Sequence, residues 1–289
     1  MSASNLAKEA LSTWETNAEF WDSGIGETGN KYWKQLQRPS LERLLGPTLS
    51  KNSGCSALEL ATGNGLCARW LADNGASSII ATDGTFGMLE QASKYMDEEK
   101  AGKISFRKLD VTEEGDFVPL VEKAAKIGGF DIVLMNMAIM DVATLDPLAD
   151  ALPKLLSKDG VRVTMKGSSS FVATLLHPVF MTSTYSRTVE VTYDPQTGDQ
   201  IITRSKSIRE YLHVKPSKGV FVVGQETRQY YFHRPLHELL GVFFERGLIL
   251  DALEEPSFTD EDGDPGKAYA TVNFPQLPPI LSLRFRRAV

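Results

Sequence analysis

The sequence has little cysteine, little histidine and no long apolar run. Its two cysteines, Cys55 and Cys67, form neither a Cys-x-x-Cys motif nor a metal-ligand spacing, so we expect a reducing compartment and no bound metal. The first residues lack an apolar signal core, and no run of about 18 apolar residues is present to span a bilayer. We therefore expect a cytoplasmic protein without a membrane partner.

An excess of positive charge is also missing. The formal net charge is −6, and the tightest basic cluster is Arg284, Arg286 and Arg287 in a strand-like tail. No basic stripe alternates with aromatic residues in the way that RNA-binding surfaces require. Because binding to phosphate backbones depends on positive charge, we expect no nucleic-acid partner.

The sequence does contain an α/β pattern. From residue 57 onward, apolar segments that predict strands alternate with segments that predict helices, for example 86–98. This alternation predicts a parallel sheet whose ligands bind beyond the carboxyl ends of the strands. The first four predicted strands are 57–61, 77–82, 104–109 and 130–135, and the last two, which follow a helix from Pro235 to about Arg246, are 248–253 and 280–285.

The fifth strand has two candidates, 160–165 and 170–176, and we prefer the second because it is more continuously apolar. Beyond it, 189–193 and 200–204 alternate like the strands of a hairpin around a turn at 194–199. We interpret the chain as one domain in four parts, with an α-helical lid broken by a glycine-rich loop at 22–30 and a β-rich insertion. The parts are the lid at 1–50, a cofactor-binding half at 51–176, a substrate insertion at 177–233, and a closing helix and two strands at 234–289.

The first predicted strand runs into a glycine turn and then a helix. Free N–H groups at the start of a helix favour a negatively charged ligand group. Gly63 to Ala68 fits the G-x-G-x-x-A pattern and Asp83 follows about twenty residues later, so a nicotinamide dinucleotide is one interpretation. Glu59 inside the first strand, Asp110 at the end of the third strand and an Asn136-Met137-Ala138-Ile139-Met140-Asp141 segment after the fourth weigh against it.

These residues together resemble the class I S-adenosylmethionine-dependent methyltransferases. The loop Glu59-Leu60-Ala61-Thr62-Gly63-Asn64-Gly65 is similar to the first motif of that family, with Ala61 in place of its first glycine. The resemblance implies a Rossmann-like, seven-stranded, mostly parallel sheet, with S-adenosyl-L-methionine as cofactor and S-adenosyl-L-homocysteine as product. Further segments resemble the stand-alone branch that methylates small molecules: Glu19-Phe20-Trp21-Asp22, Asn136 to Asp141, His177-Pro178, Phe232 to Leu236 and Asn273 to Arg287.

The resemblance also implies which residues hold the cofactor. The glycine loop would cradle the methionine group, Asp83 would bind the ribose hydroxyls, Asp110 with Val111 would read the adenine amine, and Asn136 to Ala138 would line the sulfonium. The complete implied set is Glu59, Ala61, Thr62, Gly63, Asn64, Gly65, Asp83, Gly84, Met88, Asp110, Val111, Asn136, Met137 and Ala138.

A methyl acceptor needs a general base only if its nucleophile arrives protonated. His177, which follows the fifth strand at the ligand edge, is our first candidate, and His233 is the second; the alternative for each is a structural histidine. We expect the lid and the insertion to form an apolar pocket for a small organic acceptor. The residues expected there are Trp21, Tyr32, Trp33, Asp141, His177, Tyr231 and His233.

We therefore predict methyl transfer to an oxygen, nitrogen or sulfur nucleophile, of the kind found in secondary metabolism, by a monomer or homodimer. The alternative is a methyltransferase-like protein that binds S-adenosylmethionine but catalyses a rearrangement without methyl transfer, or acts in a complex.

Overall fold

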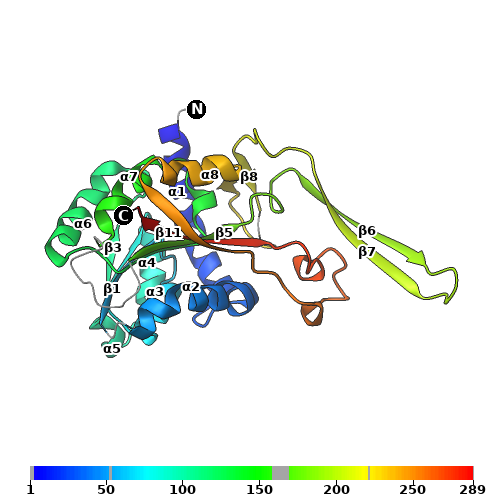
Figure 1. Cartoon of the computed structure of the whole chain (residues 1–289), viewed down its shortest axis with the longest axis horizontal. Helices are drawn as coiled ribbons and strands as arrows, with labels where there is room; N and C mark the ends of the chain where they lie inside the picture. Colours follow the sequence, from blue (N-terminus) through cyan, green and yellow to red (C-terminus); the bar gives the residue numbers. More distant parts are fainter. Residues whose placement is uncertain (1–2, 52–53, 158–168, 221, 289) are drawn as a thin grey trace.

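A seven-stranded sheet forms the centre of the protein (Figure 1). The computed structural model describes residues 3–51, 54–157, 169–220 and 222–288. The strand order is β10-β11-β5-β4-β1-β2-β3, and every neighbouring pair is parallel except the two that involve β11. The strands are β1 (Cys55–Leu60), β2 (Ala76–Asp83), β3 (Ile104–Lys108), β4 (Ile132–Asn136), β5 (Ser170–Leu176), β10 (Leu248–Glu254) and β11 (Ile280–Arg287).

The predicted mostly parallel, Rossmann-like sheet is confirmed. The fifth strand is the preferred candidate at 170–176, whereas 160–165 lies outside the described residues. The central strand β4 is buried from Ile132 to Met135, as expected where helices cover both faces of a parallel sheet.

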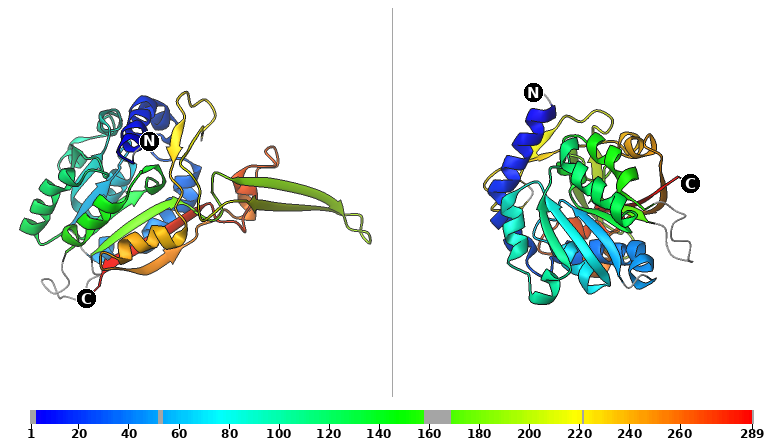
Figure 2. Two further views of the ribbon diagram at one scale, coloured as in Figure 1. Left: turned by 90° about the horizontal axis from the view of Figure 1, so that it is seen from above. Right: turned by 90° about the vertical axis from the view of Figure 1, so that its left-hand side faces the viewer.

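Helices form a layer on each face of this sheet (Figure 2). On one face, Leu58 and Leu60 of β1 belong to an apolar core that includes residues of α6, α7 and α8. On the other face, Ala57 belongs to a second core with residues of α2 and α3. These helices are α2 (Arg38–Lys51), α3 (Leu66–Asp73), α6 (Glu114–Ile127), α7 (Asp146–Leu155) and α8 (Leu236–Phe244).

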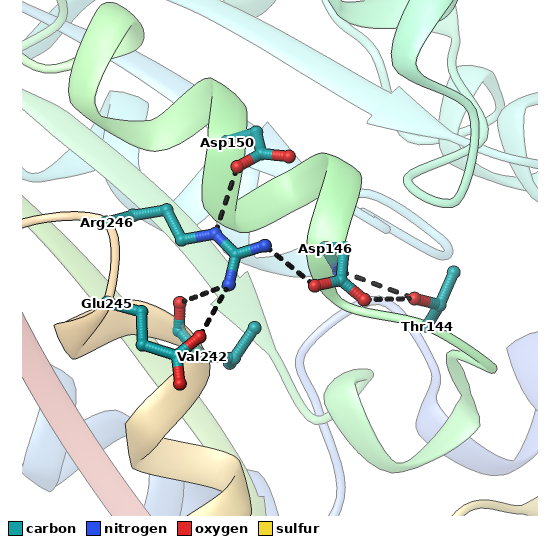
Figure 3. A network of polar contacts seen from close by, with 6 residues as sticks. All are labelled: Thr144, Asp146, Asp150, Val242, Glu245 and Arg246. Carbon is teal, nitrogen blue, oxygen red and sulfur yellow. Dashed lines mark hydrogen bonds and ion pairs between the residues drawn. The ribbon is translucent and has the colours of Figure 1, made fainter.

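Arg246 joins two helices of the first layer (Figure 3). Its guanidinium, just beyond the end of α8, donates hydrogen bonds of 2.8 Å to Asp146 and 2.9 Å to Asp150 in α7. A third nitrogen contacts the neighbouring Glu245 carboxylate at 3.2 Å. The network fixes α8 against α7, although each exposed ion pair contributes less than about 1 kcal/mol.

The predicted helix at 86–98 is wrong in length. The helix α4 (Phe86–Ser93) ends earlier, and a short α5 (Glu98–Ala101) begins after a turn. Asp97 starts this second helix because its carboxylate accepts a hydrogen bond of 2.8 Å from the Lys100 amide. A side chain that caps a new helix competes with continuation of the old one.

The N-terminal region is α-helical, as predicted. It consists of α1 (Ala3–Ile25), a turn, the π-helical segment η1 (Trp33–Gln37) and α2. The break begins after Ile25 rather than at Asp22. The helix α1 packs along α4, where the Glu15 carboxylate accepts hydrogen bonds of 2.9 and 2.8 Å from the amides of Phe86 and Gly87.

The predicted hairpin is present, but it extends away from the sheet (Figures 1 and 2). Strands β6 (Tyr185–Tyr193) and β7 (Gln200–Ile208) pair over nine residues each. The prediction that the whole insertion walls the substrate pocket therefore needs correction. Only its second part, with β8 (Ser217–Gly219) and β9 (Gln229–Tyr231), folds back onto α1.

Candidate functional site

The glycine loop leaves β1 through Ala61, whose φ angle is +52°. Thr62 then turns back, and its hydroxyl donates a hydrogen bond of 2.6 Å to the buried Glu59 carboxylate. Gly65, with a φ of +75°, precedes α3. Burial raises the pKa of Glu59 to about 8, against the opposing effect of the Thr62 hydrogen bond. Glu59 therefore stabilises the glycine loop through its hydrogen bond with Thr62.

Asp83, at the end of β2, lies beside this loop. Its carboxylate accepts hydrogen bonds of 2.9 Å from the Gly63 amide, and of 3.0 and 2.9 Å from the amide and hydroxyl of Thr85. Burial raises the pKa of Asp83 to about 6, while these three donors oppose the shift. The structure thus places Asp83 against the loop, and its binding of the ribose hydroxyls stays a prediction. The neighbouring Gly84 is covered by Leu11 of α1, since a Cβ there would lie 2.5 Å from a Leu11 methyl group.

The next strand end along the sheet carries Asp110. Its carboxylate accepts hydrogen bonds of 2.9 Å from the amide and 2.7 Å from the hydroxyl of Thr112. Val111 is buried beside it, and Met88 is buried in α4. The turn after β3 therefore has a fixed shape.

Asn136, at the end of β4, forms a chain of side-chain contacts. Its amide group donates to the Gln37 carbonyl oxygen at 2.9 Å, and its own oxygen accepts from the Thr174 hydroxyl at 2.6 Å. Met137 follows with a φ of +54°, and its amide donates to the Thr174 carbonyl at 2.8 Å. Ala138 then precedes the short 3-10 helix η2 (Ile139–Asp141).

The N-terminal region covers the glycine loop through contacts that the sequence did not reveal. The amide group of Asn64 donates to the Asp22 carboxylate at 2.9 Å and to the Gly26 carbonyl at 3.2 Å. Buried Arg69 joins the same two regions, because it donates to the Asn64 carbonyl at 2.6 Å and to the Glu27 carbonyl at 3.0 Å. An arginine at an α-helical spacing after the glycine turn is a signal that could have pointed to this role.

The three aromatic residues of the N-terminal region that are predicted to bind the acceptor lie in different surroundings. Trp33 is wrongly placed by the prediction: it is 4% exposed and packs in the core, with its ring 6.2 Å from that of Trp70. The rings of Tyr32 and Phe258 pack edge to face, with their centroids 5.2 Å apart. Trp21 instead lies against β9, where its indole N–H donates a hydrogen bond of 3.0 Å to the Gln229 carbonyl oxygen.

The segment after β9 packs on η2, just beyond Asn136. The Phe232 amide donates to the Met140 carbonyl at 2.7 Å, and Arg234 donates to the carbonyls of Ile139 and Val142. Loss of hydration raises the pKa of Asp141 well above its ordinary value. The pKa of Tyr231 is also raised, first by burial and then by the Asp141 charge. Asp141 and Tyr231 therefore share an environment of low polarity.

The two candidate bases have different surroundings. Both nitrogens of His177 are engaged, because Nδ1 accepts from the Val179 amide at 3.2 Å and Nε2 donates to the Glu255 carboxylate at 2.8 Å. His233 is fixed by one nitrogen, since Nε2 lies 2.6 Å from the Tyr211 carbonyl and must donate to it. Its Nδ1 is buried without a hydrogen-bond partner. Burial lowers the pKa of both imidazoles, so both are neutral at pH 7.

A larger cavity, of about 490 Å³, lies away from these residues. It lies beside strand β7 of the hairpin and is lined by Ile202, Arg204 and the 260–277 region, including Asn273 and Phe274. In the described ranges, no three His, Cys, Asp or Glu side chains gather in a way that would hold a metal ion. None of the helices described is long and apolar enough to cross a membrane.

Residues 57–160, which include the glycine loop, Asp83 and Asp110, match a family model described as a methyltransferase domain. This segment of the chain is therefore similar to methyltransferase domains, and it lies in a sheet with the Rossmann-like strand order. No curated protein matches the sequence of this chain closely enough to be counted as a relative.

Solved structures share the fold of this protein at low sequence identity. An S-adenosylmethionine-dependent methyltransferase from Mesorhizobium loti is 20% identical, with a TM-score of 0.63, and the match covers 91% of this chain and 100% of that one. The CcbJ methyltransferase from Streptomyces caelestis is 12% identical, with coverages of 97% and 99% and a TM-score of 0.54. The glycopeptide N-methyltransferase MtfA in complex with S-adenosylmethionine is 11% identical, with coverages of 86% and 93% and a TM-score of 0.51.

Proposed function

We propose that this protein is a methyltransferase that methylates a small organic acceptor held between α1 and residues 229–233, with His233 as the general base. The observation that carries the proposal is the buried, unpartnered Nδ1 of His233. The likeness to MtfA, a glycopeptide N-methyltransferase, supports an acceptor outside the nucleic acids.

The side chains at the strand ends fit the cofactor. The loop from Ala61 to Gly65 offers backbone donors at the start of α3 for the methionine carboxylate. Asp83 and Asp110 are acceptors suited to the ribose hydroxyls and the adenine amine. The cofactor, when bound, supplies a methyl group on a positively charged sulfur, beside which Asn136, Met137 and Ala138 would lie.

The acceptor site follows from the packing of the 231–234 segment on η2. Because η2 continues directly from Ala138, the hydrogen bond from Phe232 to Met140 supports the proposal that His233 lies near the reactive end of the cofactor site. We propose that Trp21, Tyr32, Asp141 and Tyr231 complete this acceptor site. His177, with both nitrogens engaged, is proposed to hold the end of β5 in place.

The chemistry requires one proton acceptor. As the acceptor atom forms its bond to the methyl carbon, the bond from carbon to sulfur breaks and sulfur keeps the electron pair. A hydroxyl or ammonium nucleophile must lose its proton, which Nδ1 of His233 would take. The Tyr211 carbonyl fixes the tautomer that leaves this lone pair free and then stabilises the imidazolium that forms.

The test is formation of S-adenosylhomocysteine from S-adenosylmethionine with a panel of phenols, alcohols, amines and thiols. His233→Gln keeps a donor for the Tyr211 carbonyl and should lower kcat by roughly 10²- to 10⁴-fold. Because burial lowers the pKa of His233, activity should be constant above about pH 6.5 and fall at lower pH, and this acid limb should disappear in the variant.

A matched His177→Gln variant should keep kcat and lose stability instead. A wild-type protein that binds S-adenosylmethionine tightly but never forms S-adenosylhomocysteine would support a role without methyl transfer. Sedimentation of the same samples distinguishes a monomer from a homodimer.

A further inference from the structure

Gln229 is completely buried at the contact between β9 and α1. Its side-chain carbonyl accepts the indole N–H of Trp21 at 3.0 Å. This bond fixes the orientation of the amide, since a flipped amide would set its NH₂ group against the Trp21 donor. The Nε2 end therefore carries two N–H donors, and it has no hydrogen-bond partner.

An unsatisfied buried donor needs a reason. Leaving such a donor unpaired costs about 1–3 kcal/mol, and few buried polar groups in folded proteins lack a partner. The described part of the chain has six such side-chain atoms, and two of them, Nε2 of Gln229 and Nδ1 of His233, belong to one five-residue segment.

These two atoms share a face of that segment. Tyr230 and Phe232 stack with their ring centroids 5.5 Å apart and form an apolar cluster with Ala10 of α1. Since successive side chains of an extended segment point to opposite faces, Gln229 and His233 lie on the other face. One free donor and one free acceptor therefore line the same side.

Gln229 is also linked to the glycine loop. Trp21, which orients its amide, precedes Asp22, and the Asp22 carboxylate accepts the hydrogen bond from Asn64. The amide thus lies where α1 and the returning segment meet, and the residue of α1 that follows Trp21 contacts the cofactor loop.

We infer that Gln229 determines acceptor specificity by donating a hydrogen bond from Nε2 to a carbonyl or carboxylate oxygen of the methyl acceptor, with Trp21 as its positioning residue. This inference rests on the proposed methyl transfer. It assigns the substrate a chemical class: a protic nucleophile for His233 and, apart from it, an oxygen that accepts a hydrogen bond. An acceptor without that oxygen leaves Nε2 unpaired and is selected against.

The probes are 4-hydroxybenzoate, its neutral amide 4-hydroxybenzamide, and phenol, which lacks the carbonyl oxygen. They are added to ¹⁵N-labelled protein saturated with S-adenosylhomocysteine, and the Gln229 side-chain NH₂ signals are assigned by their loss in Gln229→Glu. The signals should shift saturably with either oxygen-bearing probe and remain in place with phenol. The inference is overturned if neither oxygen-bearing probe shifts the Gln229 NH₂ signals.

Gln229→Glu keeps an acceptor for Trp21 and replaces the NH₂ donor by a carboxylate oxygen, so the Trp21 contact is kept while the proposed donor is lost. It should weaken binding of the neutral 4-hydroxybenzamide roughly 10- to 100-fold and change phenol binding less than about twofold. The control Gln200→Glu makes the same charge change on the exposed hairpin and should alter neither. Equal losses for both probes would overturn the inference, because a general disturbance of the site does not distinguish them.

Calorimetry with S-adenosylhomocysteine distinguishes a failure of the proposed function from a failure of the inference about Gln229. Wild-type protein that fails to bind it overturns the proposed function. Unchanged affinity in Gln229→Glu supports an acceptor contact, whereas a large loss would place the amide on the cofactor and overturn the inference alone.

Discussion

The side-chain amide of Asn64 in the glycine loop donates a hydrogen bond of 2.9 Å to the carboxylate of Asp22 near the end of α1. The Tyr95 hydroxyl lies 2.9 Å from the same Asp22 oxygen. One carboxylate therefore holds the N-terminal helix to the loop and to the turn after α4. Because Leu11 of the same helix covers Gly84 beside Asp83, we expect these contacts to break when the cofactor enters.

Asp22→Ala should loosen this cover. Removal of two hydrogen bonds to a charged group is expected to lower the free energy of local opening by about 2–4 kcal/mol. Hydrogen exchange of the amides in 20–30 should speed up in proportion, and S-adenosylhomocysteine should dissociate faster. The control is Glu19→Ala, on an exposed part of the same helix. Exchange that stays as slow as in the wild type would show that other contacts hold the cover.

Asp83 predicts a pH-dependent cofactor affinity. Burial raises its pKa to about 6, and ribose hydroxyls would donate to the ionised form, so binding should favour the carboxylate. The affinity for S-adenosylhomocysteine should therefore fall as pH drops through about 6, and calorimetry from pH 5 to 8 measures it. Asp83→Ala should weaken binding by about 1–3 kcal/mol at pH 8. A pH-independent affinity would mean that Asp83 serves only the loop.

The sheet and the cofactor half could be predicted from the sequence because their signals are local. A strand, its polar end and the glycine turn that follows lie within a few residues of each other, as for Glu59 and Gly63. The surroundings of Trp33 and Gln229 depend on contacts between segments that are far apart in the sequence. An aromatic residue near a loop reads the same whether it faces a ligand or, like Trp33, the core. The sequence alone does not show that Nδ1 of His233 lacks a hydrogen-bond partner, or that Nδ1 of His177 has one.

Glu59 predicts a second pH effect, on stability. Its pKa is about 8 in the folded protein and near 4.5 when unfolded, so between these values the folded state binds one more proton than the unfolded state. The free energy of unfolding should consequently fall by up to about 1.4 kcal/mol per pH unit from this group as pH rises from 4.5 to 8. Glu59→Gln should remove that slope and be more stable than the wild type at pH 8. Urea unfolding of both proteins at pH 6 and 8 decides, and identical slopes would contradict the assignment.

Ala61 has a left-handed backbone conformation, with φ at +52°, which L-residues with a Cβ adopt at a cost. Ala61→Gly should relieve that strain and raise the free energy of unfolding by up to about 1 kcal/mol, because the relief exceeds the entropy that glycine adds to the unfolded chain. Ala57→Gly in β1 is the control and should be destabilising, since this buried residue packs in the second core. A destabilising Ala61→Gly would show that the Cβ contributes more packing than strain.

The β6–β7 hairpin should be dispensable for the sheet and for cofactor binding. Its outer part exposes Val191, Tyr193 and Ile201, which are 49%, 66% and 44% exposed, and a two-stranded ribbon gains little stability alone. Its base is anchored at the paired residues Arg187 and Lys206, which contact Tyr269 and Phe180. Replacing residues 188–205 by Asn-Gly keeps those anchors and closes a tight turn. The Tm should change by less than about 2 °C and the affinity for S-adenosylhomocysteine should be unchanged. A large loss of cofactor affinity would show that the hairpin stabilises the glycine loop from a distance. A loss confined to acceptor turnover would assign the cavity that β7 lines to the acceptor.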